Sequence, residues 1–426
     1  MASLIRANVR VRMASDMESG GVAEALSPSL LDDLCFDWLH NPLRTIAKFA
    51  ANSAALLLPV HYPARWLLIP SVGFGKIKDH VWGAAMSTFG RKFSIELISD
   101  QIRWGNPWFK DMLLGWRPAG DALHRDAIEA PKHVSNGQLP EEDPKRLRLA
   151  VRNGYLNLYR GGQSVARIGF DSDGGLQARI HNKYVNGDKG SDQAYVTLTS
   201  AGFLDQERNW LRAYGGLADL HGCIANANKH VGKEKRFVDL IVARNADIID
   251  LEMALPAYSL DPKERRAPRM DLVALEPAGN RWRIVFWEAK LVSDARARCR
   301  GDDVSPKVVD QLMQYTTWLR YANHLELVAS AYQNVCRLLV AFHRLAKRVN
   351  PGIEELGPGI IAAAAADMPR LLVDDEPRLL IDNRTSDDST RSLAFTKNGH
   401  LDKLRRKGLC VQMVDSVDHM TLEPRL

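Results

Sequence analysis

The stretch RMDLVALEPAGNRWRIVFWEAK, residues 269–290, contains the most informative pattern for the fold of this chain. Two runs rich in aliphatic and aromatic residues flank the turn-forming cluster at 277–280. This pattern predicts a strand at about 270–276, a turn, and a second strand at about 281–290. Because both faces of each strand carry apolar residues, we expect both strands to lie in the interior of a sheet.

Three charged residues interrupt these apolar rows. Side chains alternate along a strand, so Asp271 shares a face with Val273, while Glu288 and Lys290 share a face with Phe286. Burying a charge costs several kcal/mol unless a partner or a metal compensates it. Charged residues in an otherwise apolar strand are therefore expected mainly at functional sites. Two carboxylates on adjacent strands can hold a hard divalent cation, and a lysine beside them can position water. This combination suits phosphodiester hydrolysis.

The spacing of these residues resembles a known signature. Asp271, followed seventeen residues later by the triplet EAK at 288–290, is similar to the motif of the PD-(D/E)XK nuclease superfamily, with Met270 in place of its proline. The resemblance covers roughly residues 230–330, about a quarter of the chain. It implies a restriction-endonuclease-like α/β fold, in which a mixed sheet is flanked by helices.

The resemblance also implies roles for individual residues. Asp271, Glu288 and the backbone carbonyl of Ala289 would bind Mg²⁺ or Mn²⁺, and Lys290 would orient or deprotonate the attacking water. Members of the superfamily usually carry a further acidic residue on a helix before the sheet. Three residues are candidates for it, of which the first matches best: Glu234, Glu252 and Glu207.

A second pair of residues extends the resemblance beyond the motif. Gln311 and Tyr315 form a QxxxY pair, as in the RecB-like branch of the superfamily. They are four residues apart, so they project from one face of a helix, which Ser305 as N-cap and Pro306 in the first turn can start. In the family this polar pair supports the substrate or the catalytic groups.

Basic residues concentrate around the same segment. Between Glu264 and Arg300 there are nine basic and five acidic residues, and the resulting +4 is most of the net charge of +6 on the whole chain. Arginines that flank a metal site suit contacts with phosphates, which weaken steeply as salt rises. The following are predicted to contact nucleic acid: Arg265, Arg266, Arg269, Arg296 and Arg298.

The whole chain divides into four predicted regions, the last of which contains the motif. Residues 1–130 form an accessory domain of unknown fold, whose tryptophans are expected in its core. Residues 131–148, polar with three prolines, are a linker. Residues 149–203 form a β-meander of at least three strands, either a separate module or an extension of the nuclease sheet. Residues 204–426 contain the nuclease domain.

Hydrophobic periodicity places further elements in this last region. Helical spacing occurs at 204–228 and 234–245, and alternation at 249–255 predicts a strand. Beyond the motif we expect, in order, a long helix at 322–346, strands within 369–383, and a helix followed by a closing strand within 399–414.

Composition restricts the class of protein. The 426 residues are 46% hydrophobic and 25% charged, which is typical of globular proteins and excludes a disordered or fibrous chain. The five cysteines are scattered, so we expect neither a disulfide framework nor a structural zinc site. Proline, histidine and arginine interrupt the most apolar stretch, 50–70, so we expect no membrane span and a cytoplasmic location.

These observations lead to one expected function and two alternatives. We expect a divalent-metal-dependent nuclease whose partner is DNA, in restriction or anti-phage defence by fold-level analogy. The first alternative is an inactive nuclease-fold module that binds nucleic acid or a partner protein. The second is a metal-dependent hydrolase of RNA or nucleotides. The sequence leaves a homodimer and a protein partner bound through the N-terminal domain as open possibilities.

Overall fold

The computed structural model describes most of the chain beyond residue 88. The described residues are 89–98, 105–121, 145–187, 195–255, 269–299, 305–321, 323–384 and 394–425. All of them belong to one compact unit, Met86–Leu426. The boundaries predicted at 130, 148 and 203 fall inside this unit. Most of the predicted accessory domain and residues 131–144 of the predicted linker lie outside the described residues.

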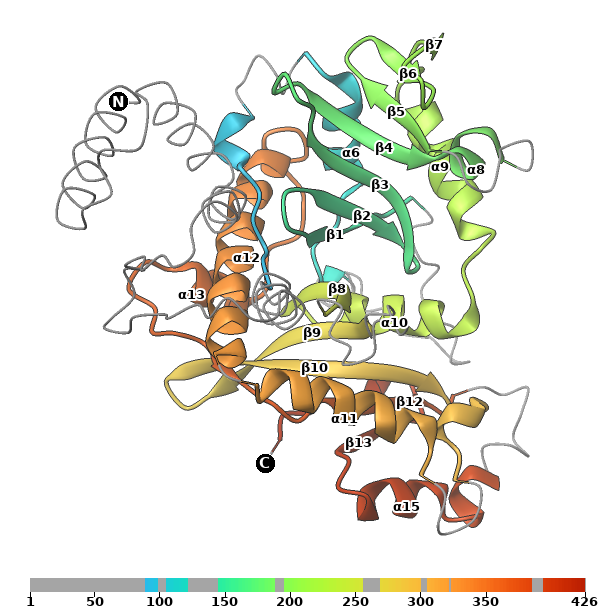
Figure 1. Cartoon of the computed structure of the whole chain (residues 1–426), viewed down its shortest axis with the longest axis vertical. Helices are drawn as coiled ribbons and strands as arrows, with labels where there is room; N and C mark the ends of the chain where they lie inside the picture. The colour runs from blue at the N-terminus through green and yellow to red at the C-terminus, as the bar shows by residue number, and fades with distance from the viewer. Residues whose placement is uncertain are drawn as a thin grey trace, which may run out of the picture. The chain divides into compact units, whose positions relative to one another are not determined.

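Seven antiparallel strands form a first sheet, in which spatial order follows sequence order (Figure 1). The strands are β1 (Arg148–Val151), β2 (Leu156–Arg160), β3 (Gln163–Phe170), β4 (Leu176–His181), β5 (Tyr195–Thr199), β6 (Gly202–Leu204) and β7 (Trp210–Arg212). The predicted β-meander of at least three strands is therefore confirmed. It is a sheet of its own rather than an extension of the second sheet, and its strands continue nine residues past 203.

The helix predicted over residues 204–228 is wrong in its first half. Only α9 (Leu217–Asn228) is helical, and the residues before it form the hairpin of β6 and β7. Asp205 closes the turn, because its carboxylate accepts hydrogen bonds from the backbone N–H of Asn209 at 2.8 Å and from its side-chain amide at 3.0 Å. Arg208 turns the chain with a φ of 66°. A side-chain-stabilised turn thus overrides helical spacing.

The second sheet is mixed and has the order β13-β12-β10-β9-β8, with β11 beside β10. Its strands are β8 (Ile248–Ala254), β9 (Arg269–Ala278), β10 (Arg281–Leu291), β11 (Leu372–Val373), β12 (Arg378–Asp382) and β13 (Val411–Val414). Strands β8, β9 and β10 are antiparallel, whereas β10, β12 and β13 run parallel. The strands predicted from the opening motif are confirmed, and both are interior strands of the sheet.

Helices cover both faces of the second sheet. The apolar side of α10 (Lys233–Arg244) packs on one face, with residues such as Leu272 and Val285. The other face, with Val273 and Phe286, packs against a larger group of helices. That group includes α11 (Lys307–Leu319), α12 (His324–Lys347) and α13 (Pro358–Ala364). The chain is a mixed α/β protein with an antiparallel and a mixed sheet flanked by helices.

Most of the remaining predicted elements are confirmed. The expected helices at 234–245 and 322–346 are α10 and α12, and the expected helix and closing strand within 399–414 are α15 (His400–Arg406) and β13. The start of α11 lies one residue later than predicted, because Pro306, rather than Ser305, is the N-cap. The other short helices are η2 (Ile95–Leu97), α6 (Pro107–Gly115), α8 (Asn182–Asn186), η4 (Ala295–Ala297) and η6 (Asp418–Met420).

One apolar core joins the two sheets. It contains Leu158 and Ile168 of the first sheet together with Val273 and Phe286 of the second. Helix α12 contacts α6, β8 and β11, so it ties the two layers together, as Figure 1 shows. Trp108 is fully buried in this core, as predicted for the tryptophans. Among the described helices, none is both long and apolar enough to cross a membrane.

A buried cluster of ions also ties α10 to the first sheet. Asp239 of α10 lies 3.4 Å from Arg146, 3.4 Å from Arg148 and 3.5 Å from Arg160. Burial by itself would raise the pKa of the Asp239 carboxyl, but the three arginines outweigh it and the pKa is lowered. A carboxyl with a lowered folded-state pKa stabilises the fold above its unfolded pKa, about 3.9, and loses that contribution as pH falls through the folded value.

We therefore expect Asp239→Asn to destabilise the protein at neutral pH and to lose less stability in acid than the wild type. The measurement is the urea midpoint followed between about pH 7 and about pH 3.5. Asp367→Asn, at an exposed position, is the control and should have the urea midpoint of the wild type at each pH. Parallel pH profiles for Asp239→Asn and the wild type would contradict the prediction.

Candidate active site

The predicted motif residues meet where β9 and β10 part. The last paired residues of the two strands are Leu272 and Trp287. Beyond them Asp271 reaches across, and its Oδ2 accepts a hydrogen bond from the backbone N–H of Ala289 at 2.9 Å. Asp271 is therefore held against the EAK triplet at 288–290, as the predicted strand pairing requires. Both carboxylates and the lysine of the motif are buried, so the site holds charge in a place of low polarity.

Lys290 is the centre of this site. Its Nζ donates to Glu288 Oε1 at 2.5 Å and to the carbonyl oxygen of Ala289 at 2.6 Å. The same ammonium group lies 3.6 Å from Glu234 and 4.0 Å from Asp271. One buried ammonium thus lies within 4.0 Å of three carboxylates. Glu234, the best candidate for the helix carboxylate, comes to the site from the first turn of α10.

A second lysine, Lys235, completes the site and was not predicted from the sequence. Its Nζ lies 2.7 Å from Asp271 Oδ1 and 2.5 Å from Glu252 Oε1. Glu252 is the second candidate for the extra carboxylate, and its backbone has a φ of 50°, which is unusual for a residue with a side chain. A signal for Lys235 was present, because a cation in the first turn of a helix faces the positive end of the helix dipole.

The site contains more carboxylates than cations. Five carboxylates face three cations along a continuous row of contacts: Glu252, Lys235, Asp271, Lys290, Glu288, Glu234, Arg296 and Asp294. Burial, followed by the charge of Asp271, raises the pKa of Glu288 to about 8, although Lys290 opposes the shift. Burial and Asp271 also raise the pKa of Glu234, against the effect of Lys290. A further positive charge would therefore be favourable here.

The oxygen atoms of the site suit a hard divalent cation. Glu288 Oε2 is buried and has no hydrogen-bond partner among the described residues. Carboxylate and carbonyl oxygens are the ligands that Mg²⁺ and Mn²⁺ prefer. In the described part of the chain, no group of three His, Cys, Asp or Glu side chains is arranged as a metal site, and the two lysines occupy several of the oxygens.

The QxxxY pair lies close to the site and contacts the sheet. Tyr315 is fully buried and its hydroxyl donates to the carbonyl of Met253 on β8 at 3.1 Å. The Gln311 amide donates to the carbonyl of Arg269 at the start of β9, at 3.2 Å. Burial, with the nearby charges of Glu288 and Asp271, raises the pKa of the Tyr315 hydroxyl well above its ordinary value. The pair therefore anchors α11 to the two strands that lead into the site.

The predicted phosphate-binding arginines differ in their exposure and in their partners. Arg265 and Arg266 lie outside the described residues. Arg269 is exposed at the start of β9 and lines a pocket beside the site. Arg296 is half-exposed but is already paired with Asp294 and Glu234. Arg298 donates twice to the carbonyl of Val292, at 3.1 and 3.0 Å, so it supports the loop after β10.

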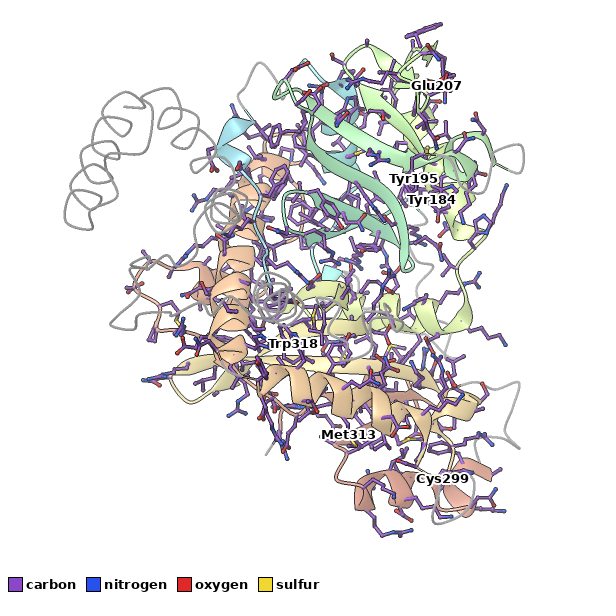
Figure 2. The ribbon with its side chains drawn as sticks, in the orientation of Figure 1. Tyr184, Tyr195, Glu207, Cys299, Met313 and Trp318 are labelled. Atoms are coloured by element: carbon purple, nitrogen blue, oxygen red, sulfur yellow. The ribbon has the colours of Figure 1, made fainter. Side chains whose placement is uncertain are left out.

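Glu207, the third candidate for the extra carboxylate, is not part of the site. It lies in the turn between β6 and β7, where it accepts a hydrogen bond from Asn209 at 3.4 Å. Figure 2 shows Glu207 at the end of the molecule opposite to β10 and α11. The structure therefore brings Glu234 and Glu252 to the motif residues, but not Glu207.

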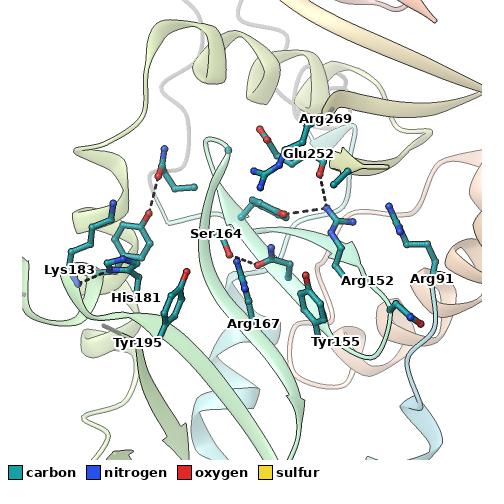
Figure 3. Close-up of a pocket in the computed structure, with 17 residues that line it drawn as sticks. Arg91, Arg152, Tyr155, Ser164, Arg167, His181, Lys183, Tyr195, Glu252 and Arg269 are labelled. Carbon is teal, nitrogen blue, oxygen red and sulfur yellow. Dashed lines mark hydrogen bonds between the residues drawn. The ribbon is translucent and has the colours of Figure 1, made fainter. Parts of the chain in front are cut away.

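The pocket beside the site was also missed by the sequence analysis. It has a volume of about 510 Å³ and opens between the outer face of the first sheet and the strands β8 and β9 (Figure 3). Glu252 belongs to both places, because it lines the pocket and pairs with Lys235. Gly162 in the β2–β3 turn packs on Lys235 where the pocket meets the site, because a Cβ on Gly162 would lie 2.7 Å from the Lys235 side chain. The signal was the alternation of apolar with aromatic and basic residues along 155–197.

Comparisons of the chain with protein-family models, with curated proteins and with solved structures find no significant match. The assignment of a function therefore depends on the side chains described above and on the spacing of the motif in the sequence.

Proposed function

We propose that the protein is a divalent-metal-dependent nuclease that hydrolyses DNA phosphodiester bonds. In this proposal the second sheet and its helices are a restriction-endonuclease-like domain of the PD-(D/E)XK superfamily. One observation carries the proposal: the buried Lys290 ammonium lies within 4.0 Å of the three carboxylates of Asp271, Glu288 and Glu234. These are the residues that the sequence motif assigns to one site.

The chain's own groups have distinct tasks in this reaction. Hydrolysis forms a bond from a water oxygen to phosphorus and breaks the bond from phosphorus to a sugar oxygen, while charge increases on the remaining phosphate oxygens. The water loses a proton to solvent, and the departing sugar oxygen takes one up from solvent. Two N–H groups of Lys290 donate to Glu288 and Ala289, and the third would orient the water and stabilise this charge. Asp271 and Glu288 hold the site together from adjacent strands. Gln311 and Tyr315 keep α11 against β9 and β8, so the site is already arranged before the substrate binds.

A metal ion would be held by oxygen atoms of Asp271, Glu288, Glu234 and the carbonyl of Ala289. When bound, Mg²⁺ or Mn²⁺ would neutralise phosphate charge and promote ionisation of the attacking water. The excess of carboxylates over cations and the unpartnered Glu288 Oε2 support this assignment. Lys235 would then contact a phosphate of the DNA backbone, because it lies beside Asp271 on the side of the site that faces the pocket.

One observation favours a second candidate, an inactive nuclease-fold module that binds nucleic acid. Lys235 and Lys290 both pair with carboxylates of the motif, and such an arrangement is also stable without any metal. This module would bind DNA in a salt-dependent manner without turnover.

The test is cleavage of linear, circular and single-stranded DNA and of RNA by the purified chain. Each substrate is incubated with Mg²⁺ or Mn²⁺ and, in parallel, with EDTA. We expect metal-dependent cutting of DNA that EDTA abolishes. If the chain cuts only RNA, RNA takes the place of DNA as the proposed substrate. If the chain binds DNA in EDTA but cuts it with neither metal, the inactive module is favoured.

A further inference from the structure

The outer face of the first sheet differs in character from its inner face. Strands β2 to β5 direct apolar side chains such as Leu158, Ile168 and Leu198 into the core. Several alternate positions on the other face carry aromatic and basic side chains, among neutral polar ones such as Asn157 and Thr197. The aromatic and basic residues are Tyr155, Arg167, Arg179, His181 and Tyr195. A solvent-facing sheet face usually carries mixed charges, so a face of aromatic rings and cations indicates a ligand.

Among the described residues, no carboxylate pairs with two of the cations on this face. Arg167 and Arg179 are directly opposite each other on β3 and β4, a like-charged pair that is unfavourable by itself. Both are exposed, and neither forms an ion pair with a carboxylate within the described part of the chain. Each guanidinium instead lies over the ring of Tyr195, at 5.6 and 5.5 Å from its centroid. An anionic ligand would relieve this repulsion.

The tyrosines beside these arginines are half-buried, and a base could take the place of a guanidinium on either ring when the arginine pairs with a phosphate. Tyr155 and Tyr195 flank Arg167, at 5.9 and 5.6 Å, and Figure 3 shows all three side chains pointing into the same pocket. The hydroxyls of Tyr155 and Tyr195 have no hydrogen-bond partner among the residues that the structure describes. Among the described residues that line the pocket, Arg167, Lys183 and Arg269 are cations in addition to Arg91 and Arg152, which pair with buried Asp250, and Glu252 is the one carboxylate. The pocket volume of about 510 Å³ lies in the range of small-ligand sites.

We propose that this pocket binds an unpaired nucleotide of a DNA strand. A base can stack on Tyr155 or Tyr195, and an adjacent phosphate can pair with Arg167 and Arg179. The opposite wall of the pocket contains Glu252, whose partner Lys235 contacts Asp271. A strand held in the pocket would therefore continue past Lys235 into the carboxylate site. This inference deepens the proposed function, and it rests on that function for the place of cleavage but not for binding.

The test measures binding of a short fluorescein-labelled oligo-dT by fluorescence anisotropy, in EDTA and at several salt concentrations. The wild type should bind this strand more tightly than a duplex of the same length. Tyr195→Leu, which keeps apolar volume but removes the ring, should weaken binding roughly 5- to 150-fold without changing the salt dependence. Arg167→Gln should instead reduce the slope of log affinity against log salt by about 0.7.

Two matched variants control for indirect effects. Tyr195→Phe keeps the ring and should bind like the wild type. Arg208→Gln removes an exposed arginine of the same sheet outside the pocket and should also bind like the wild type. Circular dichroism checks that each variant is folded, and Tyr155→Leu repeats the test at the second ring.

The proposal is overturned if the tyrosine-to-leucine variants and Arg167→Gln all bind oligo-dT as the wild type does. It is also overturned if free dTMP competes as well as the oligonucleotide, because the pocket would then take a nucleotide rather than a strand. Binding that depends on the pocket but is not followed by cleavage in Mg²⁺ or Mn²⁺ would support this inference and contradict only the proposed nuclease activity.

Discussion

Lys290→Ala is expected to reduce metal-dependent DNA cleavage by about 100- to 1000-fold, the loss typical of removing one electrostatic contact with the transition state. The buried ammonium is within 4.0 Å of three carboxylates, so no neighbouring cation can take its place with the same geometry. Asp271→Asn should have a similar effect, because it keeps the shape of the side chain and removes its charge. The measurement is the single-turnover cleavage rate at saturating metal.

These variants need a control for stability, because loss of Lys290 leaves Glu288 buried without its partner. The double variant Glu288→Gln with Lys290→Met removes both charges, and neutral replacements of a buried pair are often tolerated. We expect it to be folded and inactive. Lys307→Ala, at an exposed position on α11, should cleave like the wild type. A wild-type rate in purified Lys290→Ala or Asp271→Asn would refute the assignment of the site.

Asp250→Asn is expected to lower the free energy of unfolding by about 3–5 kcal/mol, as when one partner of a buried ion pair is removed. The Asp250 carboxylate is almost completely buried on β8. It pairs with Arg91 at 3.2 Å and with Arg152 at 2.5 Å, and it accepts the hydroxyl of Tyr332 at 2.9 Å. These partners come from the segment before the first sheet, from the end of β1 and from α12. Asparagine would leave two buried arginines without a counter-charge.

Urea unfolding followed by tryptophan fluorescence measures this loss. Tyr332→Phe removes only one hydrogen bond of the same cluster and should cost about 1 kcal/mol. Asp375→Asn, whose partner Arg320 lies at the surface, should leave the midpoint unchanged. Equal midpoints for Asp250→Asn and the wild type would show that the cluster does not hold the two sheets together.

Local sequence patterns predicted the elements around the site well. The alternation of apolar residues identified β9 and β10, and the spacing of Gln311 and Tyr315 placed both on one face of α11. The prediction failed at 204–216, where a turn closed by Asp205 overrode helical spacing. Such a turn depends on hydrogen bonds of a single side chain, which a periodic pattern does not contain.

The partners of the motif residues could not be read from the sequence. Lys235 is next to Glu234 in the chain, yet only the packing of α10 against the sheet brings it to Asp271. Arg298 looked suited to phosphate, but the fold directs it to the carbonyl of Val292. Likewise, the aromatic and basic face of the first sheet becomes a pocket only because β8 lies opposite to it.

Local patterns in the sequence were enough to predict which strands carry Asp271, Glu288 and Lys290 and that these side chains share the interior of one sheet. This information is local. The turn specifies which two strands pair, and the alternation of side chains along each strand specifies the face of the sheet to which each one points. The tertiary structure decided that Lys235, Glu234 and Glu252 join them and that an aromatic, cationic pocket lies alongside. Contacts between distant segments depend on how whole layers pack, and the free energy of that packing comes from a core shared by both sheets.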